Sequence, residues 1–146
     1  DDSFDKISYL HVIEHVHKPI KSLLELRRVL KMNGKAVISF QNKFGLETFG
    51  LNLSKKFEYI LGGDKAGFSK PKGVKDVRRS YFQIKKMCKK TGLNIVRVDG
   101  CILMLPSIAW RFSILRKPTL ILSDFLQKLP LIKYFSSYIA VTVTKI

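Results

Sequence analysis

The sequence predicts an α/β fold in which helices cover both faces of a mostly parallel sheet. Three observations carry the prediction. Residues 4–42 run from a short apolar segment through a helical stripe into a second apolar segment, the order of a βαβ unit with parallel strands. Residues 80–100 repeat a helix followed by a strand, and residues 136–146 alternate β-branched and other side chains as a strand does. The 146 residues are near the commonest size of one domain.

The first unit contains a strand over residues 4–12, "FDKISYLHV", and a helix over residues 17–34, "HKPIKSLLELRRVLKMNG". Pro19 suits the first turn of that helix, and Gly34 is expected to end it. The second strand, "KAVISFQN" at residues 35–42, has a nearly continuous apolar run. Such a run is typical of a strand covered on both faces.

The second unit is expected to follow a mobile basic loop, the glycine- and lysine-rich residues 62–79. Ser80 and Gln83 have the spacing of a capping box, so a helix should begin there, and Gly92 should end it. The strand "NIVRVDG" comes next.

The last part of the chain, residues 101–135, has apolar side chains at helical spacing interrupted by prolines. We expect an amphipathic helical cap laid over the sheet. Residues 136–146 should then form a final strand at an edge or in a hairpin.

The charge of the chain is strongly positive, at +16 with a pI near 10.0. Residues 55–100 alone hold thirteen Lys and Arg against four Asp and Glu. Such a field favours nucleic acid, anionic lipid or phosphorylated small molecules without choosing among them. A solvated lysine-rich surface is the alternative explanation.

The cysteines and the hydropathy pattern indicate a compartment. Cys88 and Cys101 lack metal-binding or redox spacing, and the sequence does not open on a signal-peptide pattern, which favours a reducing, cytoplasmic location. The longest uncharged stretch of the C-terminal half, "GCILMLPSIAW", is about half of a membrane span. We therefore expect no transmembrane span.

The string "DDSFDKISYLHVIEHVHKPIKSLLELRRVLKMNGKAVISFQN" resembles the second half of class I S-adenosylmethionine (SAM)-dependent methyltransferases, of the type 11 and ubiquinone-biosynthesis O-methyltransferase kind. "YFQIKKMCKKTGLNIVRVDG" looks like the family's next helix and sixth strand, and "SYIAVTVTKI" like its seventh, antiparallel strand. The resemblance implies a partial Rossmann-like methyltransferase fold with SAM as cofactor. The family's G-x-G-x-G loop lies upstream of the match, so we expect a C-terminal portion of the domain whose activity is incomplete in this chain alone.

By the same resemblance, Tyr9, Leu10 and His11 line the cofactor pocket where the first strand leaves the sheet, mainly through backbone groups and shape. His11 is then nearest the acceptor and is the candidate general base, since imidazole titrates near neutral pH. A histidine that only shapes the pocket is the alternative. Asn42, after the second strand, is expected to orient the acceptor or else to satisfy loop backbone groups.

His11, Glu14 and His15 have a spacing that one helical turn brings to one face. Ubiquinone-biosynthesis O-methyltransferases bind a divalent ion at this place, so the resemblance implies a metal site there. The same letters, H-x-x-E-H, form a zinc-protease motif, but that motif needs a long helix, whereas here a strand precedes it and Pro19 starts a new helix. The remaining interpretation is that Glu14 and His15 cap that helix.

Three functions compete. The first is methyl transfer to a small, bulky or lipidic acceptor, with the cap of residues 101–135 touching anionic membrane peripherally. The second is single-stranded nucleic-acid binding, since residues 65–90 combine ten Lys and Arg with Phe68, Tyr81 and Phe82. The third is a non-catalytic remnant that serves as an interaction module.

Overall fold

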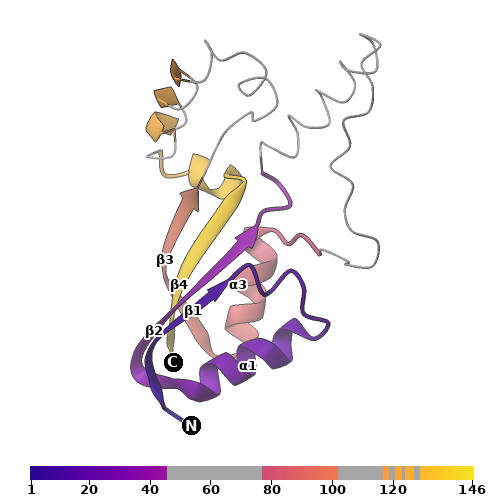
Figure 1. Ribbon diagram of the computed structural model, residues 1–146, viewed down its shortest axis with the longest axis vertical. Helices are drawn as coiled ribbons and strands as arrows, with labels where there is room; N and C mark the ends of the chain where they lie inside the picture. The colour runs from indigo at the N-terminus through magenta and orange to yellow at the C-terminus, as the bar shows by residue number, and fades with distance from the viewer. Residues whose placement is uncertain (46–76, 102–116, 119–120, 123, 127–128) are drawn as a thin grey trace.

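In a computed structural model the chain forms a four-stranded mixed sheet with two helices packed against it (Figure 1). The structure describes residues 1–45, 77–101, 117–118, 121–122, 124–126 and 129–146. The elements in chain order are β1 (Phe4–Leu10), α1 (Pro19–Val29), β2 (Leu30–Gln41), α3 (Tyr81–Lys90), β3 (Leu93–Cys101), the 3₁₀ helix η1 (Ile132–Phe135) and β4 (Tyr138–Lys145). The strand order is β1-β2-β4-β3.

The strand directions confirm the α/β class and the antiparallel last strand. β1 and β2 pair in parallel, and β4 runs antiparallel to both β2 and β3. Three strands therefore share one direction, although only β1 and β2 form a parallel pair.

The expectation that the last strand lies at an edge or in a hairpin is wrong, because β4 lies between β2 and β3. Its residues Ile139 and Val143 are fully buried, and both of its edges carry ladder hydrogen bonds. Alternation of β-branched residues indicates that one face is buried. It carries no information about which strands lie on either side.

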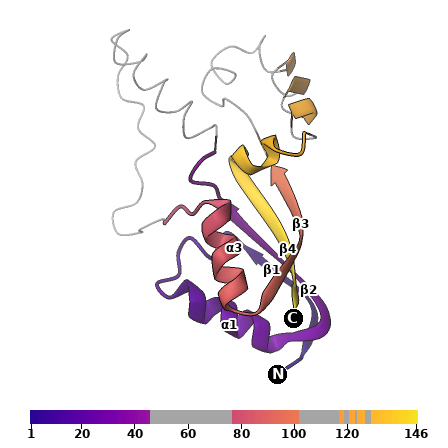
Figure 2. The ribbon, with the colours of Figure 1, turned by 180° about the vertical axis from the view of Figure 1, so that it is seen from behind.

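The helices α1 and α3 lie on the same face of the sheet. Ile38 and Val141 point to the same side as Phe40, and all three share a core with Leu23 of α1 and Ile84 of α3. Figures 1 and 2 show α3 behind the sheet in one view and in front of it in the other. The side chains that alternate with these on β2 and β4 are half-buried.

The helix α1 ends at Val29 rather than at Gly34. Leu30 is already extended and pairs with Phe4, after which the register jumps so that Lys6 faces Lys35. The residues between them form a bulge in β2. A Cβ at Gly34 would lie 2.7 Å from the Leu30 side chain and 3.0 Å from the Phe4 carbonyl oxygen. Gly34 is therefore required by a close approach of backbone in the bulge.

The signals that predicted the second helix are confirmed. The Ser80 hydroxyl oxygen accepts from the Gln83 backbone N–H at 3.3 Å, and the Gln83 side chain accepts from the Ser80 N–H at 2.9 Å. Gly92 follows the helix with a φ of +69°, the left-handed conformation that glycine adopts at low cost.

Two predicted segments fall largely outside the described residues. Of the loop predicted over residues 62–79, only 77–79 are described, and they lie against the rest of the fold: the Val77 N–H donates to the Glu14 carbonyl oxygen at 3.1 Å. Of the cap predicted over residues 101–135, residues 117–118, 121–122 and 124–126 are helical and residues 132–135 form η1. Within the described residues, no helix is both long and apolar enough to cross a membrane.

Candidate functional site

The candidate site lies where β1 and β2 leave the sheet. The two strands are parallel, so Leu10 and Ser39 pair near the same end, and ligands of open α/β sheets bind outside such carboxyl ends. The His11 backbone N–H donates to the Ser39 carbonyl oxygen at 3.1 Å. His11 therefore sits directly beyond the last pair of the ladder, as the sequence predicted.

His11 adopts a left-handed backbone conformation, with a φ of +55°. For a residue other than glycine this conformation costs about 1–3 kcal/mol and persists only where the surroundings impose it. Here the ring is held by two neighbours: Nδ1 lies 3.1 Å from the Glu14 carboxylate oxygen, and the ring meets Tyr138 edge-on with centroids 5.2 Å apart. About half of the side chain, 48%, stays exposed.

Glu14 is the buried partner of this histidine, with a side chain 7% exposed. Its Oε1 accepts from the Gln41 backbone N–H at 2.5 Å and faces His11 Nδ1. A buried carboxylate is tolerated when hydrogen bonds replace its lost water. Glu14 thus connects the loop after β1 to the end of β2.

Arg79 closes the site from the other side. Its Nη1 donates to the Ile13 carbonyl oxygen at 2.5 Å and to the Val77 carbonyl oxygen at 3.1 Å. Burial lowers the pKa of Arg79, and the nearby Glu14 carboxylate acts in the opposite direction. The guanidinium therefore holds the loop of residues 11–15 against the segment that precedes α3.

Tyr9 and Leu10 point to opposite faces of the sheet. Tyr9 packs against the helix-covered core, and its hydroxyl lies 2.6 Å from the Ser22 hydroxyl. Leu10 lies on the other face and is 55% exposed. An adenosyl group needs apolar contact and backbone polar groups. The Leu10 side chain and the backbone of Tyr9 and His11 fit that requirement on one side of such a group.

Asn42 is buried, with 1% of its surface exposed. Its Nδ2 donates to the carbonyl oxygens of Tyr134 at 2.8 Å and Ser136 at 3.0 Å, and its Oδ1 accepts from the Phe44 N–H at 3.3 Å. These bonds use the amide to connect the end of β2 to η1. The acceptor-orienting role expected for Asn42 stays a prediction.

The metal site predicted at His11, Glu14 and His15 is not supported. Across the described ranges, no group of three or more His, Cys, Asp or Glu side chains is placed to hold an ion. Glu14 is turned inward to His11 and Gln41. His15 is exposed one residue further along a turn, where its N–H donates to the Val12 carbonyl oxygen at 3.0 Å.

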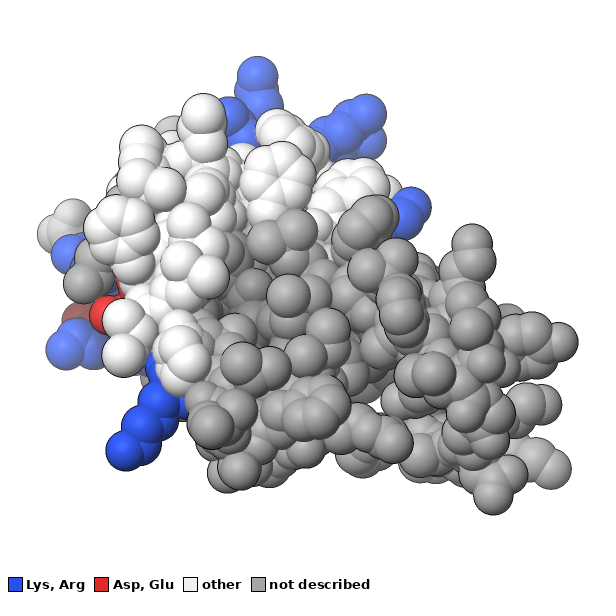
Figure 3. Space-filling view, turned by 90° about the horizontal axis from the view of Figure 1, so that it is seen from above, with Lys and Arg blue, Asp and Glu red and all other residues white. Residues whose placement is uncertain are grey.

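Exposed apolar side chains gather along the described pieces of the predicted cap. In Figure 3, which views the molecule from above, the described surface at this end is largely uncharged, with Lys and Arg and a smaller acidic area at its rim. The strongly exposed apolar residues of this segment are Ile121, Leu122, Phe125, Leu131 and Phe135. They form what we call the apolar end of the molecule.

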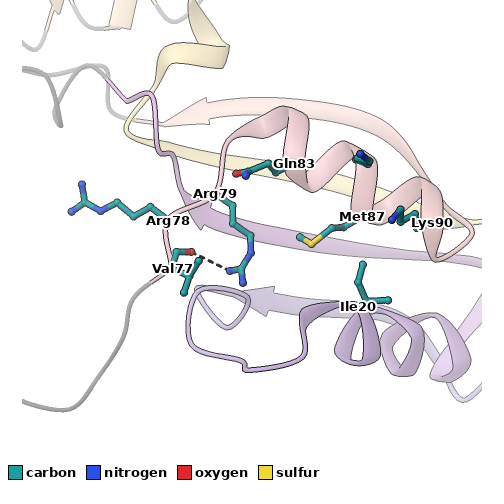
Figure 4. A pocket seen from close by; sticks show the side chains of 8 residues that line it. Ile20, Val77, Arg78, Arg79, Gln83, Met87 and Lys90 are labelled. Atoms are coloured by element: carbon teal, nitrogen blue, oxygen red, sulfur yellow. Dashed lines mark hydrogen bonds between the residues drawn. The ribbon is translucent and has the colours of Figure 1, made fainter.

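A separate hollow of about 410 Å³ lies between the start of α1 and α3. Figure 4 shows Arg79 reaching from the loop towards the Val77 carbonyl group at the rim of this hollow. Its lining residues are Ile20, Val77, Arg78, Arg79, Gln83, Lys86, Met87 and Lys90. The hollow shares Arg79 with the strand-exit site, but the predicted cofactor and catalytic residues do not line it.

Sequence reasoning missed two members of the strand-exit site, Arg79 and Tyr138. Arg79 comes directly before the Ser80 capping box, and the parallel bridge between Asn42 and Arg79 brings it to the end of β2. Tyr138 opens β4 and pairs with Gln41. Only the unexpected central position of β4 places that ring beside His11.

Comparisons with known proteins agree with this geometry. Residues 1–38 match the model of a methyltransferase domain. An uncharacterized protein of Methanocaldococcus jannaschii is 32% identical over 84 residues, which are 58% of this chain and 32% of that protein.

Solved structures match over nearly the whole chain. A SAM-dependent methyltransferase of Thermotoga maritima is 16% identical with a TM-score of 0.61, covering 100% of this chain and 57% of its own. Magnesium protoporphyrin IX methyltransferase of Synechocystis, solved with bound SAH, is 14% identical with a TM-score of 0.51, covering 100% and 47%. The chain thus spans about half the length of the structures it matches.

The fold is that of class I methyltransferases. The family model matches residues 1–38, and the solved SAM-dependent methyltransferases share the fold of this chain at 15–16% identity. They do not favour the nucleic-acid-binding alternative. Tyr81, one of the aromatics on which that alternative depended, is buried and packs on Tyr134 with centroids 4.7 Å apart.

Proposed function

We propose that the protein transfers a methyl group from SAM to a small-molecule acceptor at the strand-exit site, with His11 as the general base. The observation that carries the proposal is the strained, half-exposed His11 ring backed by the buried carboxylate of Glu14. Backbone strain and a buried carboxylate–imidazole pair both concentrate at functional sites.

The chemistry needs little from the protein beyond alignment and one proton transfer. SAM, when bound, supplies a methyl group on a positively charged sulfur. Holding the reactants in line can account for about 7–11 kcal/mol of the barrier. Where the acceptor oxygen or nitrogen carries a proton, His11 Nε2 accepts it, and such a base contributes about 10²–10⁴-fold.

The proposed cofactor contacts are the backbone of Tyr9 and His11 and the exposed side chain of Leu10. We propose no substrate or cofactor contact for Asn42, because its amide already bonds two carbonyl groups and a backbone N–H. The proposed activity is that of the whole protein, since the chain spans about half of the structures it resembles.

The proposed acceptor is apolar or lipidic and is presented at an anionic membrane surface. Support comes from the apolar end, where Phe125 is 63% and Leu131 is 74% exposed. Lys117 and Lys133 lie in the same segment. Apolar side chains flanked by lysines are typical of elements that lie in the membrane interface.

The role of His11 as the base is tested by a methyl-transfer assay. The protein is incubated with a lipid extract and with SAM that carries a labelled methyl group. We expect label to enter an extractable product, and His11→Asn to reduce the rate about 10²–10⁴-fold while calorimetry shows unchanged SAM binding. His15→Asn is the matched control and should keep the rate. Full activity of His11→Asn would contradict the assignment of the base, and no heat of SAM binding by the wild-type protein would contradict the activity itself.

The membrane contact is tested separately by flotation with vesicles of phosphatidylglycerol and phosphatidylcholine. The wild-type protein should float with the anionic vesicles, and Leu131→Ser should weaken flotation without changing SAM binding. Flotation that is independent of both vesicle charge and Leu131 would refute this part of the proposal.

A further inference from the structure

We propose that Glu14 is a positioning residue that fixes the tautomer and orientation of His11, so that Nδ1 carries the proton and Nε2 faces the reaction site. The effect on turnover rests on the proposed role of His11 as a base. The effect on the His11 tautomer does not rest on that role, and it can be measured without a methyl acceptor.

The position of the Glu14 carboxylate fits this role. Glu14 lies three residues after His11, and its side chain is almost fully buried while the His11 ring is half exposed. The Oε1 atom that faces His11 Nδ1 at 3.1 Å also accepts from the Gln41 backbone N–H at 2.5 Å. That N–H belongs to the last residue of β2, so the sheet itself sets the position of the carboxylate.

Hydrogen-bonding chemistry then determines which nitrogen of the His11 ring carries the proton. An ionised carboxylate is an acceptor only, so the ring nitrogen that faces it must carry a proton. In the neutral imidazole the other nitrogen, Nε2, holds the lone pair. The His11 ring also meets the Tyr138 ring in a T-shaped contact, which restricts the ring plane from a second side.

Arg79 lies near Glu14, but the hydrogen bonds of its Nη1 are made to backbone carbonyl groups. Its Nη1 donates to the carbonyl oxygens of Ile13 and Val77. The Glu14 Oε1 atom stays directed at His11 Nδ1 and the Gln41 backbone N–H. Ser-His-Asp hydrolases orient their histidine base in the same way, with a buried carboxylate bonded to Nδ1.

A purely structural role for Glu14 makes a different prediction. It would require only the bond to the Gln41 N–H, which holds the loop of residues 11–15 to β2. Removing the carboxylate would then lower stability without changing the His11 tautomer. The two roles are separated by observing the ring directly.

The experiment is ¹⁵N NMR of the protein labelled at histidine, at a pH where the rings are neutral, with the His11 signals assigned from His11→Asn. In the wild-type protein we expect Nδ1 to carry the proton. In Glu14→Ala the proton should divide between Nδ1 and Nε2, and Glu14→Gln, which keeps the shape and one acceptor oxygen, should lie between the two. Glu25→Gln, at an exposed carboxylate of α1, is the matched control and should leave the spectrum unchanged.

The outcomes separate this inference from the proposed function. A His11 tautomer that is the same in wild type, Glu14→Ala and Glu14→Gln overturns the positioning role. If the tautomer moves and methyl transfer falls about 10²-fold in both Glu14 variants, both proposals stand. If the tautomer moves but transfer is unchanged in both Glu14→Gln and His11→Asn, positioning stands and the base is wrong. Because Glu14→Gln is isosteric, folding failure of Glu14→Ala leaves the test intact.

Discussion

Replacing Asn42 with alanine should destabilise the fold strongly. The substitution removes the two amide protons that bond the carbonyl oxygens of Tyr134 and Ser136, and the oxygen that accepts from the Phe44 N–H. Asn42 is 1% exposed, so water does not readily replace these bonds. A buried polar group left without a partner costs about 1–3 kcal/mol. Because the three bonds share one side chain and are not additive, we expect a total loss of roughly 2–5 kcal/mol.

The measurement is urea denaturation of the whole protein. With an m-value of about 2 kcal/mol per molar, a loss of about 3 kcal/mol lowers the midpoint by about 1.5 M. Asn42→Asp should be at least as damaging, since it places a carboxylate oxygen where two carbonyl oxygens need a donor. Asn33→Ala, at an exposed position of the β2 bulge, is the control. Asn42→Ala with an unchanged midpoint but lost methyl transfer would refute the reasoning and favour the acceptor-orienting role.

Three further predictions concern α3 and the strand β3 that follows it. Ser80→Ala removes the hydroxyl half of the capping box and should lower the free energy of unfolding by about 1 kcal/mol. The same urea denaturation measures this loss. Ser3→Ala, at an exposed position, is the control and should have no effect. Cys88 is buried and Cys101 is exposed, so iodoacetamide should alkylate Cys101 rapidly and Cys88 only after unfolding; equal rates in the native protein would contradict the packing. Burial raises the pKa of Cys88 to about 11, so the unfolded chain loses this proton first and stability should fall as pH rises from about 9 to 11. Cys88→Ala should remove that part of the pH dependence.

The fold was predictable where local chemistry determines it. The capping box at Ser80 and the stop at Gly92 depend on neighbouring residues only, and the structure contains both. The end of α1 was not predictable, because Leu30 leaves the helix to pair with Phe4, 26 residues earlier. The central position of β4 depends likewise on pairing with two distant strands. Sequence patterns record burial and turn chemistry, whereas strand order depends on contacts across the chain.

The site was predictable only in part, for a related reason. The exit of β1 at His11 follows from the length of an apolar run that ends before a polar segment. The sequence does not predict that Glu14 turns inward. A glutamate near two histidines is equally compatible with a metal site or a helix cap. What distinguishes these possibilities is the Gln41 N–H, which β2 brings to within 2.5 Å of the carboxylate.

His11 and Asn42 differ in how their side chains are bonded, which bears on the role proposed for His11. Every polar group of the Asn42 side chain is used in bonds that stabilise the fold. His11 does the opposite, because its left-handed backbone costs about 1–3 kcal/mol and half of its ring remains exposed. Asparagine or glycine would adopt that conformation more easily. A protein that holds a histidine there, and buries a carboxylate to orient it, accepts a local loss of stability. The proposed proton transfer at the strand exit would account for the exposed, left-handed histidine, which the stability of the fold does not require.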